Sequence, residues 1–400
     1  MLSLLNGRRV PSPRVLVLVA TLAAALVLLI AMPPIVIMSA KHCSAADGDV
    51  LARPTARTSH SRHVQEALDS SPAAHTGQAL RPPAHTVVNA ARNANLTIAT
   101  FATSANRGFC DTILSAAAYG LVPTVIGWGD PWRGYRSKVV TTLAFLKSLP
   151  PENIVLFHDG FDVHFQASKQ QLLAAFLRQN ASILYMAEKN CWPMTDERCD
   201  AAFPVSPLPR WAWGPNTVYQ AHSHVLNIPH FINAGTMMGY ARTTTALFSE
   251  MARRVAEIEL AGNKADDQEI VGELYLSGAF GIKLDFWMDA MMSMHFSKDD
   301  TTLQPDFVNF EPAEAAVRRV RRHKITGTVP GILHFNGNGK NWMESFAKSS
   351  WWRNTTLLAR GSVVFRTVGG ETVQWEPVCS RFYLTWPQWI ASLLDSSVLF

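Results

Sequence analysis

Two aspartates that follow a short apolar stretch are the first residues whose types and spacing could do chemistry. Residues 154–157 predict a buried strand, which breaks at Asp159-Gly160-Phe161-Asp162. In open α/β sheets, ligands bind beyond the carboxyl ends of the strands, and carboxylates suit Mg²⁺ or Mn²⁺. The spacing therefore predicts a divalent-cation site at a strand end. The alternative is an Asp-rich turn without a ligand, because Asp and Gly are ordinary turn residues.

The segments around this strand predict an α/β fold. Residues 96–101 and 123–128 read as strands on either side of a helical segment, residues 111–119. A strand–helix–strand order favours a parallel sheet with right-handed crossovers. The other expected strands are residues 182–187, 231–241, 282–285 and 331–335, and the other expected helices are residues 139–149, 168–179, 243–260 and 266–275.

The N-terminal part of the chain predicts a membrane anchor. Residues 15–40 contain no charged residue, and Arg8, Arg9 and Arg14 precede them. Such a stretch can cross a bilayer, and the positive-inside rule places the tail, residues 1–14, in the cytosol. A cleaved signal peptide, the alternative, has a shorter apolar core. We therefore expect a single-pass type II protein of the endoplasmic reticulum or Golgi membrane, with residues 41–92 as a flexible stem and the catalytic domain in the lumen.

The composition and the spacing of the cysteines argue against some classes of function. The 400 residues carry a net charge of +5, and no interleaved basic and aromatic pattern argues for nucleic acid. None of the five cysteines shows CxxC spacing, which argues against structural zinc. Cys191 and Cys199 would form a local disulfide in an oxidising compartment. Sequons at Asn95, Asn180 and Asn354 agree with a lumenal location.

An ordered set of motifs across about residues 95–345 resembles the glycosyltransferase domain of the procollagen lysyl hydroxylase/glucosyltransferase family and, more distantly, glycogenin-type transferases. The resemblance is carried by Trp132-Arg133-Gly134 with Lys138, Asp159-Gly160-Phe161-Asp162, Phe231-Ile232-Asn233-Ala234-Gly235 with Gly239-Tyr240, Asp266-Asp267-Gln268, and His334-Phe335-Asn336-Gly337-Asn338-Gly339-Lys340. It implies a GT-A fold with a Rossmann-like, mostly parallel central sheet in residues 93–345. Residues 346–400 resemble nothing that we can assign and are expected to be an extension. The family's glycine run before the lysine is missing between Trp132 and Lys138.

The resemblance also implies a metal site. It assigns Asp159, Asp162 and His334 as ligands of Mn²⁺ or Mg²⁺, which would leave open positions for diphosphate oxygens. For His334, the alternative is a strand-end histidine that is hydrogen-bonded locally. Lys340 would lie near the diphosphate as a point charge, and Gly337 and Gly339 would let the backbone approach it closely.

Other residues receive substrate roles from the same resemblance. Trp132, Lys138 and Phe161 are expected on the nucleotide side. The alternatives are that Trp132 is a packed loop aromatic and that Phe161 packs in the core rather than on uracil. Gly235 would face the sugar. The catalytic candidates are Asn233, whose amide could hold sugar hydroxyls, and Asp266 and Asp267, one of which could instead serve the N-terminus of a helix. Trp192 is expected to line the acceptor cleft.

The function that follows is a metal-dependent transferase. It would move glucose or galactose from a UDP-sugar to a hydroxyl acceptor on a protein or glycan of the secretory pathway. One alternative is a non-catalytic lumenal carbohydrate-binding or scaffold protein on a degenerate transferase fold, which would not need all three metal ligands. The other is a metal-dependent phosphohydrolase, for which the sequence lacks an evident second set of ligands.

Overall fold

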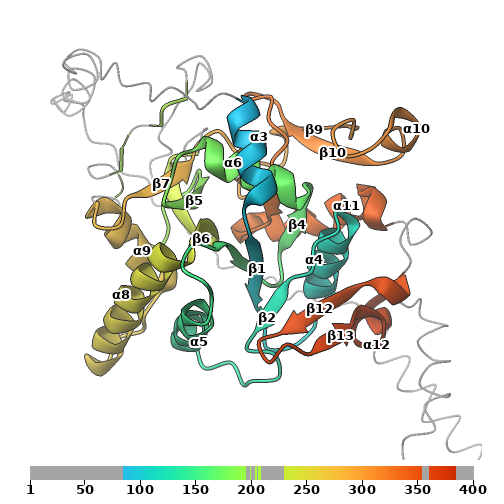
Figure 1. The fold of residues 1–400 in the computed structure, drawn as a ribbon. Coiled ribbons are helices and arrows are strands. Elements are labelled where there is room, and N and C mark those ends of the chain that lie inside the picture. Colours follow the sequence, from blue (N-terminus) through green and yellow to red (C-terminus); the bar gives the residue numbers. More distant parts are fainter. Residues whose placement is uncertain are drawn as a thin grey trace, which may run out of the picture. The chain divides into compact units, whose positions relative to one another are not determined.

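An eight-stranded mixed sheet forms the centre of the domain (Figure 1). In spatial order its strands are β13 (Thr372–Gln374), β12 (Val364–Thr367), β2 (Thr124–Ile126), β1 (Leu96–Phe101), β3 (Ile154–Asp159), β6 (Phe231–Tyr240), β5 (Ile183–Glu188) and β7 (Ile282–Asp285). Only β6 and β13 run antiparallel to their neighbours. The other strands share one direction. The predicted α/β fold with a mostly parallel central sheet is therefore confirmed.

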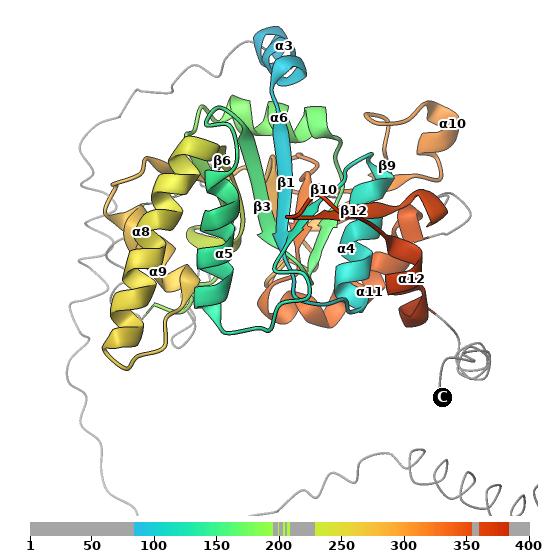
Figure 2. The same ribbon diagram turned by 60° about the horizontal axis from the view of Figure 1, so that its bottom comes forward.

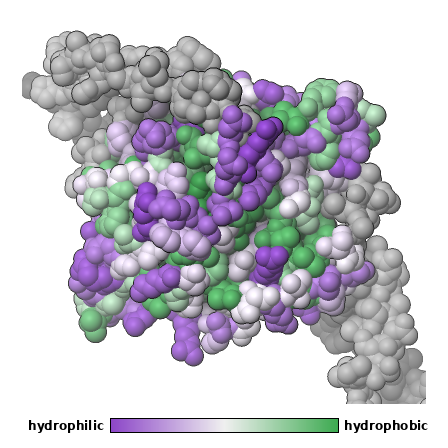
Figure 3. All heavy atoms as spheres, in the orientation of Figure 1, coloured by the Kyte–Doolittle hydropathy of each residue, from purple (hydrophilic) through white to green (hydrophobic). Residues whose placement is uncertain are grey.

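The computed structural model describes residues 84–194, 199, 203–204, 206–208, 229–353 and 360–383, all within the compact unit Thr76–Phe400. The predicted tail, signal anchor and most of the stem lie outside these residues, as does the Asn354 sequon. Within the described ranges, no helix has the length and apolar character needed to cross a bilayer. The face seen in Figure 3 mixes hydrophilic and hydrophobic residues.

Helices cover both faces of the central sheet, which explains the uninterrupted apolar run in β3. Ile154 and Leu156 pack into one core cluster, whereas Val155 and Phe157 pack into the other, because successive strand residues point to opposite faces. One face is covered by α5 (Tyr135–Lys147), α8 (Ala241–Leu260) and α9 (Asp267–Leu276), and the other by α4 (Arg107–Ala118), α6 (Lys169–Arg178), α11 (Lys340–Ser349) and α12 (Trp375–Cys379) (Figure 2).

A small three-stranded sheet brings distant parts of the chain together beside the end of β3. In it, β11 (Ile332–His334) lies between β4 (Val163–Phe165) and β8 (Met291–Ser293). His334 pairs with Val163 in register, and the backbone amide of Phe335 donates to the carbonyl oxygen of Asp162 at 2.7 Å. Asp162 and His334 are therefore held side by side. A separate two-stranded ribbon consists of β9 (Thr301–Pro305) and β10 (Arg319–His323), with the short α10 (Pro312–Ala315) between them.

The structure revises both predicted domain boundaries. Helix α3 (Ala84–Asn93) occupies the end of the predicted stem, where Val87 and Ala91 are buried and the helix packs on α6. Val87 and Ala91, four positions apart, lie on one face of the helix, which explains why this segment packs on the domain.

At the other end, the boundary at residue 345 falls inside α11. Strand β12 beyond it pairs with β2, so residues 360–383 complete the central sheet rather than form a separate extension. A disulfide between Cys110 and Cys379 also joins α4 to α12. This joining depends on contacts between segments that are far apart in the sequence.

Candidate active site

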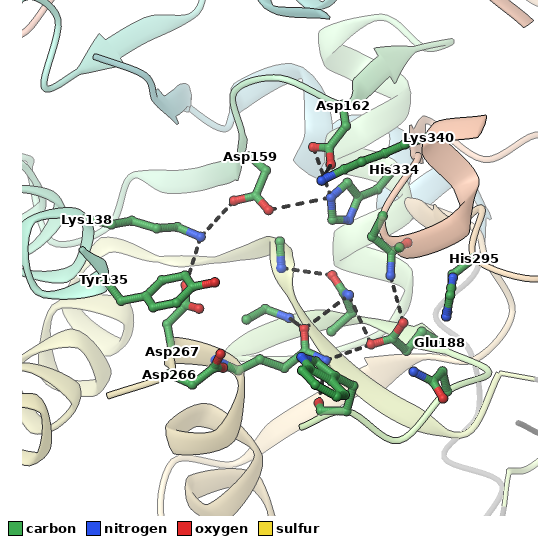
Figure 4. Close-up of a pocket in the computed structure, with 18 residues that line it drawn as sticks. Tyr135, Lys138, Asp159, Asp162, Glu188, Asp266, Asp267, His295, His334 and Lys340 are labelled. Carbon is green, nitrogen blue, oxygen red and sulfur yellow. Dashed lines mark hydrogen bonds and ion pairs between the residues drawn. The ribbon is translucent and has the colours of Figure 1, made fainter. Parts of the chain in front are cut away.

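A polar cavity of about 430 Å³ opens at the carboxyl ends of β3 and β5 (Figure 4). It brings together most of the residues predicted from the sequence: Lys138, Asp159, Asp162, Asn233, Gly235, Asp266, Asp267, His334, Gly337 and Lys340. Trp192, which was expected in the acceptor cleft, lines it too, with its side chain largely exposed. The position agrees with the rule that ligands bind beyond the carboxyl ends of parallel strands.

Asp159, Asp162 and His334 form a group that could hold a metal ion. Asp159 ends β3, Asp162 follows the turn after it, and His334 ends β11. The Nε2 atom of His334 lies 3.3 Å from Oδ1 of Asp162 and 3.5 Å from Oδ2 of Asp159. Neighbouring ligands of an octahedral ion with bonds of about 2.1 Å lie about 3.0 Å apart. The three side chains are therefore close to the spacing that a shared cation requires.

The state of His334 tests whether these residues fit a cation. Its ring is buried, and neither ring nitrogen has a hydrogen-bond partner in the described part of the chain. Burial by itself would lower the pKa of His334, but the carboxylates of Asp162 and Asp159 outweigh it and raise that pKa. Burial likewise opposes ionisation of Asp162, yet His334 and Lys340 hold its pKa below the usual range. Two carboxylates thus favour positive charge beside a buried imidazole whose Nε2 atom faces both of them, so the residues fit a divalent cation.

Gly235 leaves the space that the His334 ring occupies. A Cβ atom at this position would lie 2.1 Å from Cε1 of His334 and 2.7 Å from Oδ2 of Asp159. Any larger side chain would therefore displace two members of the metal group. The prediction placed Gly235 beside the sugar. The structure keeps it in the cavity wall and adds this steric reason for a glycine.

Lys138 links the metal group to the start of α9. Its buried ammonium lies 2.7 Å from Oδ1 of Asp159 and 2.8 Å from Oδ2 of Asp267. Burial disfavours the charged lysine, but the two carboxylates outweigh that cost and raise its pKa. Lys138 was predicted on the nucleotide side. The structure gives it the task of fixing Asp159 and Asp267 in place.

The neighbouring acids Asp266 and Asp267 have different roles, one at the N-terminus of a helix and the other in the cavity. Asp266 is the N-cap of α9 and accepts hydrogen bonds from the backbone amides of Gln268, at 2.9 Å, and Glu269, at 3.2 Å. Asp267 is buried and faces the cavity beside Lys138, and burial raises its pKa. Asp267 is therefore the stronger candidate for chemistry, whereas Asp266 starts the helix.

Lys340 is a cation with freedom to move at the cavity rim. Its side chain is 62% exposed, and its ammonium lies 3.3 Å from Oδ2 of Asp162. It begins α11 directly after the turn η2 (Gly337–Gly339). Gly337 has a φ of +51° and passes beneath the His295 ring, where a Cβ atom would lie 2.3 Å from Nδ1. The glycine therefore lets the backbone pass close to His295 in the cavity wall, and its approach to a diphosphate stays a prediction.

Glu188 is a cavity residue that sequence reasoning missed. It is buried at the end of β5 and accepts hydrogen bonds from Asn233, at 3.1 Å, Gln268, at 2.8 Å, and Asn336, at 2.7 Å. Burial raises its pKa to about 7, although these amide donors favour the ionised form. A signal was available, since Glu188 ends an apolar strand just as Asp159 does. Tyr135, His295 and Gln268 line the cavity as well and were also missed.

Asn233 has a different role from the predicted one. Its amide nitrogen donates to Glu188 and to Gln268 Oε1, and its oxygen accepts from the backbone amide of Gly235 at 2.9 Å. Both donor hydrogens are thus used within the chain. Asn233 lines the cavity but positions its neighbours, and it has no donor left for a sugar hydroxyl.

Three predicted residues do not line the cavity. Trp132 is 53% exposed and contacts Phe101 and Tyr135 edge-on, so Tyr135 reaches the cavity in its place. Phe161 packs against the hydrophobic core on the other side of its turn. Gly339 is buried beside the backbone of Met294. Spacing along the chain predicted these positions, but the direction of each side chain depends on the tertiary turn.

The predicted Cys191–Cys199 disulfide is present next to the cavity. The carbonyl oxygen of Trp192 accepts a hydrogen bond from Gln268 Nε2 at 2.6 Å, which joins the disulfide segment to the Glu188 network. Asp285, the last residue of β7, is buried, does not line the cavity and accepts hydrogen bonds from the backbone amides of Ala290 and Met291. Its role is structural.

Comparisons with known proteins identify similar sequences. Residues 92–207 match the family model described as the PLOD GT domain. The chain is 26% identical over 261 residues to a procollagen-lysine,2-oxoglutarate 5-dioxygenase of Drosophila melanogaster, covering 62% of this chain and 31% of that protein. It is 24% identical over 271 residues to the human multifunctional procollagen lysine hydroxylase and glycosyltransferase LH3, covering 64% and 32%.

The chain therefore spans about one third of the length of the curated relatives that it matches. Among solved structures, the glycosyltransferase GlyE of Streptococcus pneumoniae aligns over 66% of this chain and 64% of that one, with 11% identity and a TM-score of 0.32. That score is too low to support an argument. The family model and the relatives confirm the resemblance to a PLOD-type glycosyltransferase domain.

Proposed function

From a domain that resembles the glycosyltransferase domain of PLOD proteins, we propose that this chain is a divalent-cation-dependent hexosyltransferase. It would move glucose or galactose from a UDP-sugar to a hydroxyl of a protein or glycan. One observation carries the proposal: the ligand atoms of Asp159, Asp162 and His334 come together in a single cavity beside the exposed cation Lys340. That set provides what a departing nucleoside diphosphate needs.

The donor diphosphate would bind at the metal group. Asp159, Asp162 and His334 would hold Mn²⁺ or Mg²⁺, which would act as a Lewis acid on the diphosphate oxygens. Lys340 would leave Asp162 and pair with the phosphate, since an exposed ammonium 3.3 Å from one carboxylate oxygen can turn at little cost. Tyr135, at the opposite end of the cavity from His295 in Figure 4, would mark the nucleoside side.

The transferred sugar would lie between Asp267 and Glu188. Lys138 fixes Asp267 so that its other oxygen is available to a sugar or acceptor hydroxyl. Glu188 orders the amides of Asn233, Gln268 and Asn336 and so keeps the cavity wall rigid. Such preorganisation lowers the cost of orienting the reacting groups.

The setting that we propose is the lumen of the endoplasmic reticulum or Golgi, with residues 15–40 as the signal anchor. Two disulfides support an oxidising compartment. The uncharged stretch and the arginines before it support the anchor and its orientation.

The alternative remains a non-catalytic carbohydrate-binding protein on a degenerate fold. The same cavity could hold a nucleotide-sugar without transferring it. Turnover therefore distinguishes the two readings, whereas binding alone does not.

The test is donor hydrolysis by the full-length chain in detergent. UDP-glucose, UDP-galactose, UDP-N-acetylglucosamine and GDP-mannose are compared with Mn²⁺ and with chelator, and release of the nucleoside diphosphate is measured. We expect release from one UDP-hexose that depends on Mn²⁺ and falls at least about 100-fold in Asp162→Asn. Asp299→Asn, which changes an exposed acid, is the control and should keep full activity.

Two results would count against the transferase. If the activity with chelator equalled the activity with Mn²⁺, the proposed dependence on a metal ion would be wrong. Mn²⁺-dependent UDP binding without turnover, even with added protein and glycan acceptors, would favour the carbohydrate-binding alternative.

A further inference from the structure

Two of the three sequons lie at the same end of the central sheet, and both asparagines are exposed. Asn95 precedes β1, and Asn180 lies in the turn between α6 and β5. The helices that precede them, α3 and α6, pack together at this end (Figure 2). The amide groups of Asn95-Leu96-Thr97 and Asn180-Ala181-Ser182 are therefore presented on a shared surface.

This end of the sheet is remote from the cavity. The carbonyl oxygen of Asn95 accepts from the amide of Ile154, the first residue of β3, whereas Asp159 ends that strand at the cavity. A strand rises about 3.3 Å per residue, so the strand separates the two by about 16 Å. The same holds for Asn180, which precedes β5, because Glu188 lies at the far end of β5. A bulky group on either asparagine would leave the cavity open.

Local structure accounts for only part of the Asn180 sequon. Asn180 has a φ of 47°, a left-handed conformation that asparagine tolerates better than most residues. The turn thus explains why an asparagine occupies position 180. It does not explain why the exposed position 182, two residues later, is a serine. Asn95 does not have a left-handed backbone conformation, so the explanation that applies to Asn180 does not apply to the Asn95 sequon.

The disulfides supply an independent indication of the compartment. Cys110–Cys379 joins residues 269 positions apart, and Cys191–Cys199 closes a local loop. Disulfides persist in oxidising compartments, and the endoplasmic reticulum lumen is where sequons are modified.

We propose that Asn95 and Asn180 are N-glycosylated, and that both glycans lie on the end of the domain opposite the cavity. The donor would be a lipid diphosphate-linked oligosaccharide, used by the lumenal oligosaccharide transferase. The side-chain amide nitrogen forms a bond to C1 of the first sugar and loses one proton. The bond from C1 to the diphosphate oxygen breaks, and the lipid diphosphate leaves with its electron pair. No oxidant or reductant is required.

The test uses the full chain expressed in a eukaryotic secretory host. All variants carry Asn354→Gln, so that only these two sequons are read. We expect peptide N-glycosidase to shift the protein in two steps, one lost in Asn95→Gln and the other in Asn180→Gln. Mass spectrometry should find each asparagine converted to aspartate on enzymatic release. Thr97→Ala and Ser182→Ala should remove the same steps while keeping both asparagines, which separates glycan loss from misfolding.

The outcomes separate this proposal from the transferase. No shift, with the chain either protected in the lumen or never translocated, would overturn the glycan assignment. Enzymatic removal of the glycans should change UDP release by less than about twofold, because they lie away from the cavity, and a loss of activity would contradict their placement. A chain that is glycosylated but inactive on every donor would leave this proposal standing and remove only the proposed activity.

Discussion

A comparison of two partly buried clusters of charged side chains in the described part of the domain shows what marks a site. The cavity cluster consists of Lys138, Asp159, Asp162, His334 and Lys340. Among them, His334 keeps both ring nitrogens without a hydrogen bond, and Lys340 is mostly exposed. Its groups face a cavity and are only partly satisfied by one another.

The C-terminal cluster consists of Arg107, Asp111, Glu344, Arg353 and Tyr383. Asp111 is 1% exposed, accepts from the Tyr383 hydroxyl at 2.7 Å and pairs with Arg353 at 3.2 Å. Arg353 and Arg107 both pair with Glu344. The cluster lies next to the Cys110–Cys379 disulfide, and none of its residues lines the 430 Å³ cavity.

Both clusters contain buried acids whose pKa is shifted, so burial and titration do not identify the site. Burial raises the pKa of Asp111 to about 6 in the C-terminal cluster, whereas His334 and Lys340 hold the pKa of Asp162 below its usual range in the cavity cluster. What separates the clusters is that the groups of the first adjoin a cavity and include three side chains whose ligand atoms could hold one metal ion. We therefore interpret the cavity cluster as functional. The C-terminal cluster instead stabilises the packing of residues 360–383 on the domain.

The largest expected effect comes from removing the Cys110–Cys379 disulfide. The double variant Cys110→Ser/Cys379→Ser should lower the free energy of unfolding by about 4 kcal/mol, because the bond closes a very long loop. UDP release below the new melting temperature should stay within about twofold. Denaturant unfolding and activity assays measure the two quantities.

The matched comparison is Cys191→Ser/Cys199→Ser, which opens a loop closed over a separation of 8 residues. Here stability should fall less, while activity should fall more, because Trp192 and its bond to Gln268 lie in the cavity wall. If the first variant lost activity and the second did not, the division between the two regions would be wrong.

A second prediction concerns Gly235→Ala. The new Cβ atom would displace His334 and Asp159, so Mn²⁺-dependent UDP binding should weaken by about 100-fold, or about 2.7 kcal/mol. Calorimetric titration of UDP in the presence of Mn²⁺ measures this. Gly361→Ala is the control, since a Cβ atom there meets nothing within 4 Å. Unchanged affinity in Gly235→Ala would argue against His334 as a ligand.

A third prediction concerns pH and Asp111. The folded pKa of about 6 lies above the ordinary value of 3.8, so the folded state binds this proton more tightly than the unfolded state does. Stability contributed by this group is therefore lost as the pH rises from about 4 to about 6. The free energy of unfolding of the wild type minus that of Asp111→Asn should fall by about 2 kcal/mol between about pH 4.5 and 7. A flat difference would mean that Arg353 keeps Asp111 ionised throughout.

The smallest effect is expected for Lys340→Ala. Loss of one exposed phosphate-binding cation should raise the KM for the UDP-sugar about tenfold, or about 1.4 kcal/mol, with little change in kcat. Lys348→Ala removes another exposed lysine of α11 that pairs with Glu344 at 3.6 Å, and it should leave kinetics unchanged. Equal effects in both variants would point to general charge rather than a contact made by Lys340.

Local patterns in the sequence predicted β1, β2, β3, β5, β6, β7, β11 and most helices, but not β4, β8, β9, β10, β12 or β13. The metal group was predicted from the ordered motifs of the family resemblance. The apolar run of β3 ends at a pair of acids, Ser168 begins α6 with a capping box, and Gly120 follows α4 with a φ of 71°. His334 was predicted from the order of motifs. The Cys191–Cys199 disulfide could likewise be predicted, because the two cysteines are close together in the sequence.

Tertiary structure decided which side chains face the cavity and where the domain ends. Phe161 turns into the core, Asn233 uses its donors on its neighbours, and Glu188 enters the cavity from β5. Residues 360–383 join the sheet through β12 and the Cys110–Cys379 bond. The physical reason is the same in each case. The spacing of apolar residues in the sequence indicates whether one segment is a helix or a strand. The direction of a side chain and the extent of the domain depend instead on the register and packing of elements that are far apart in the chain.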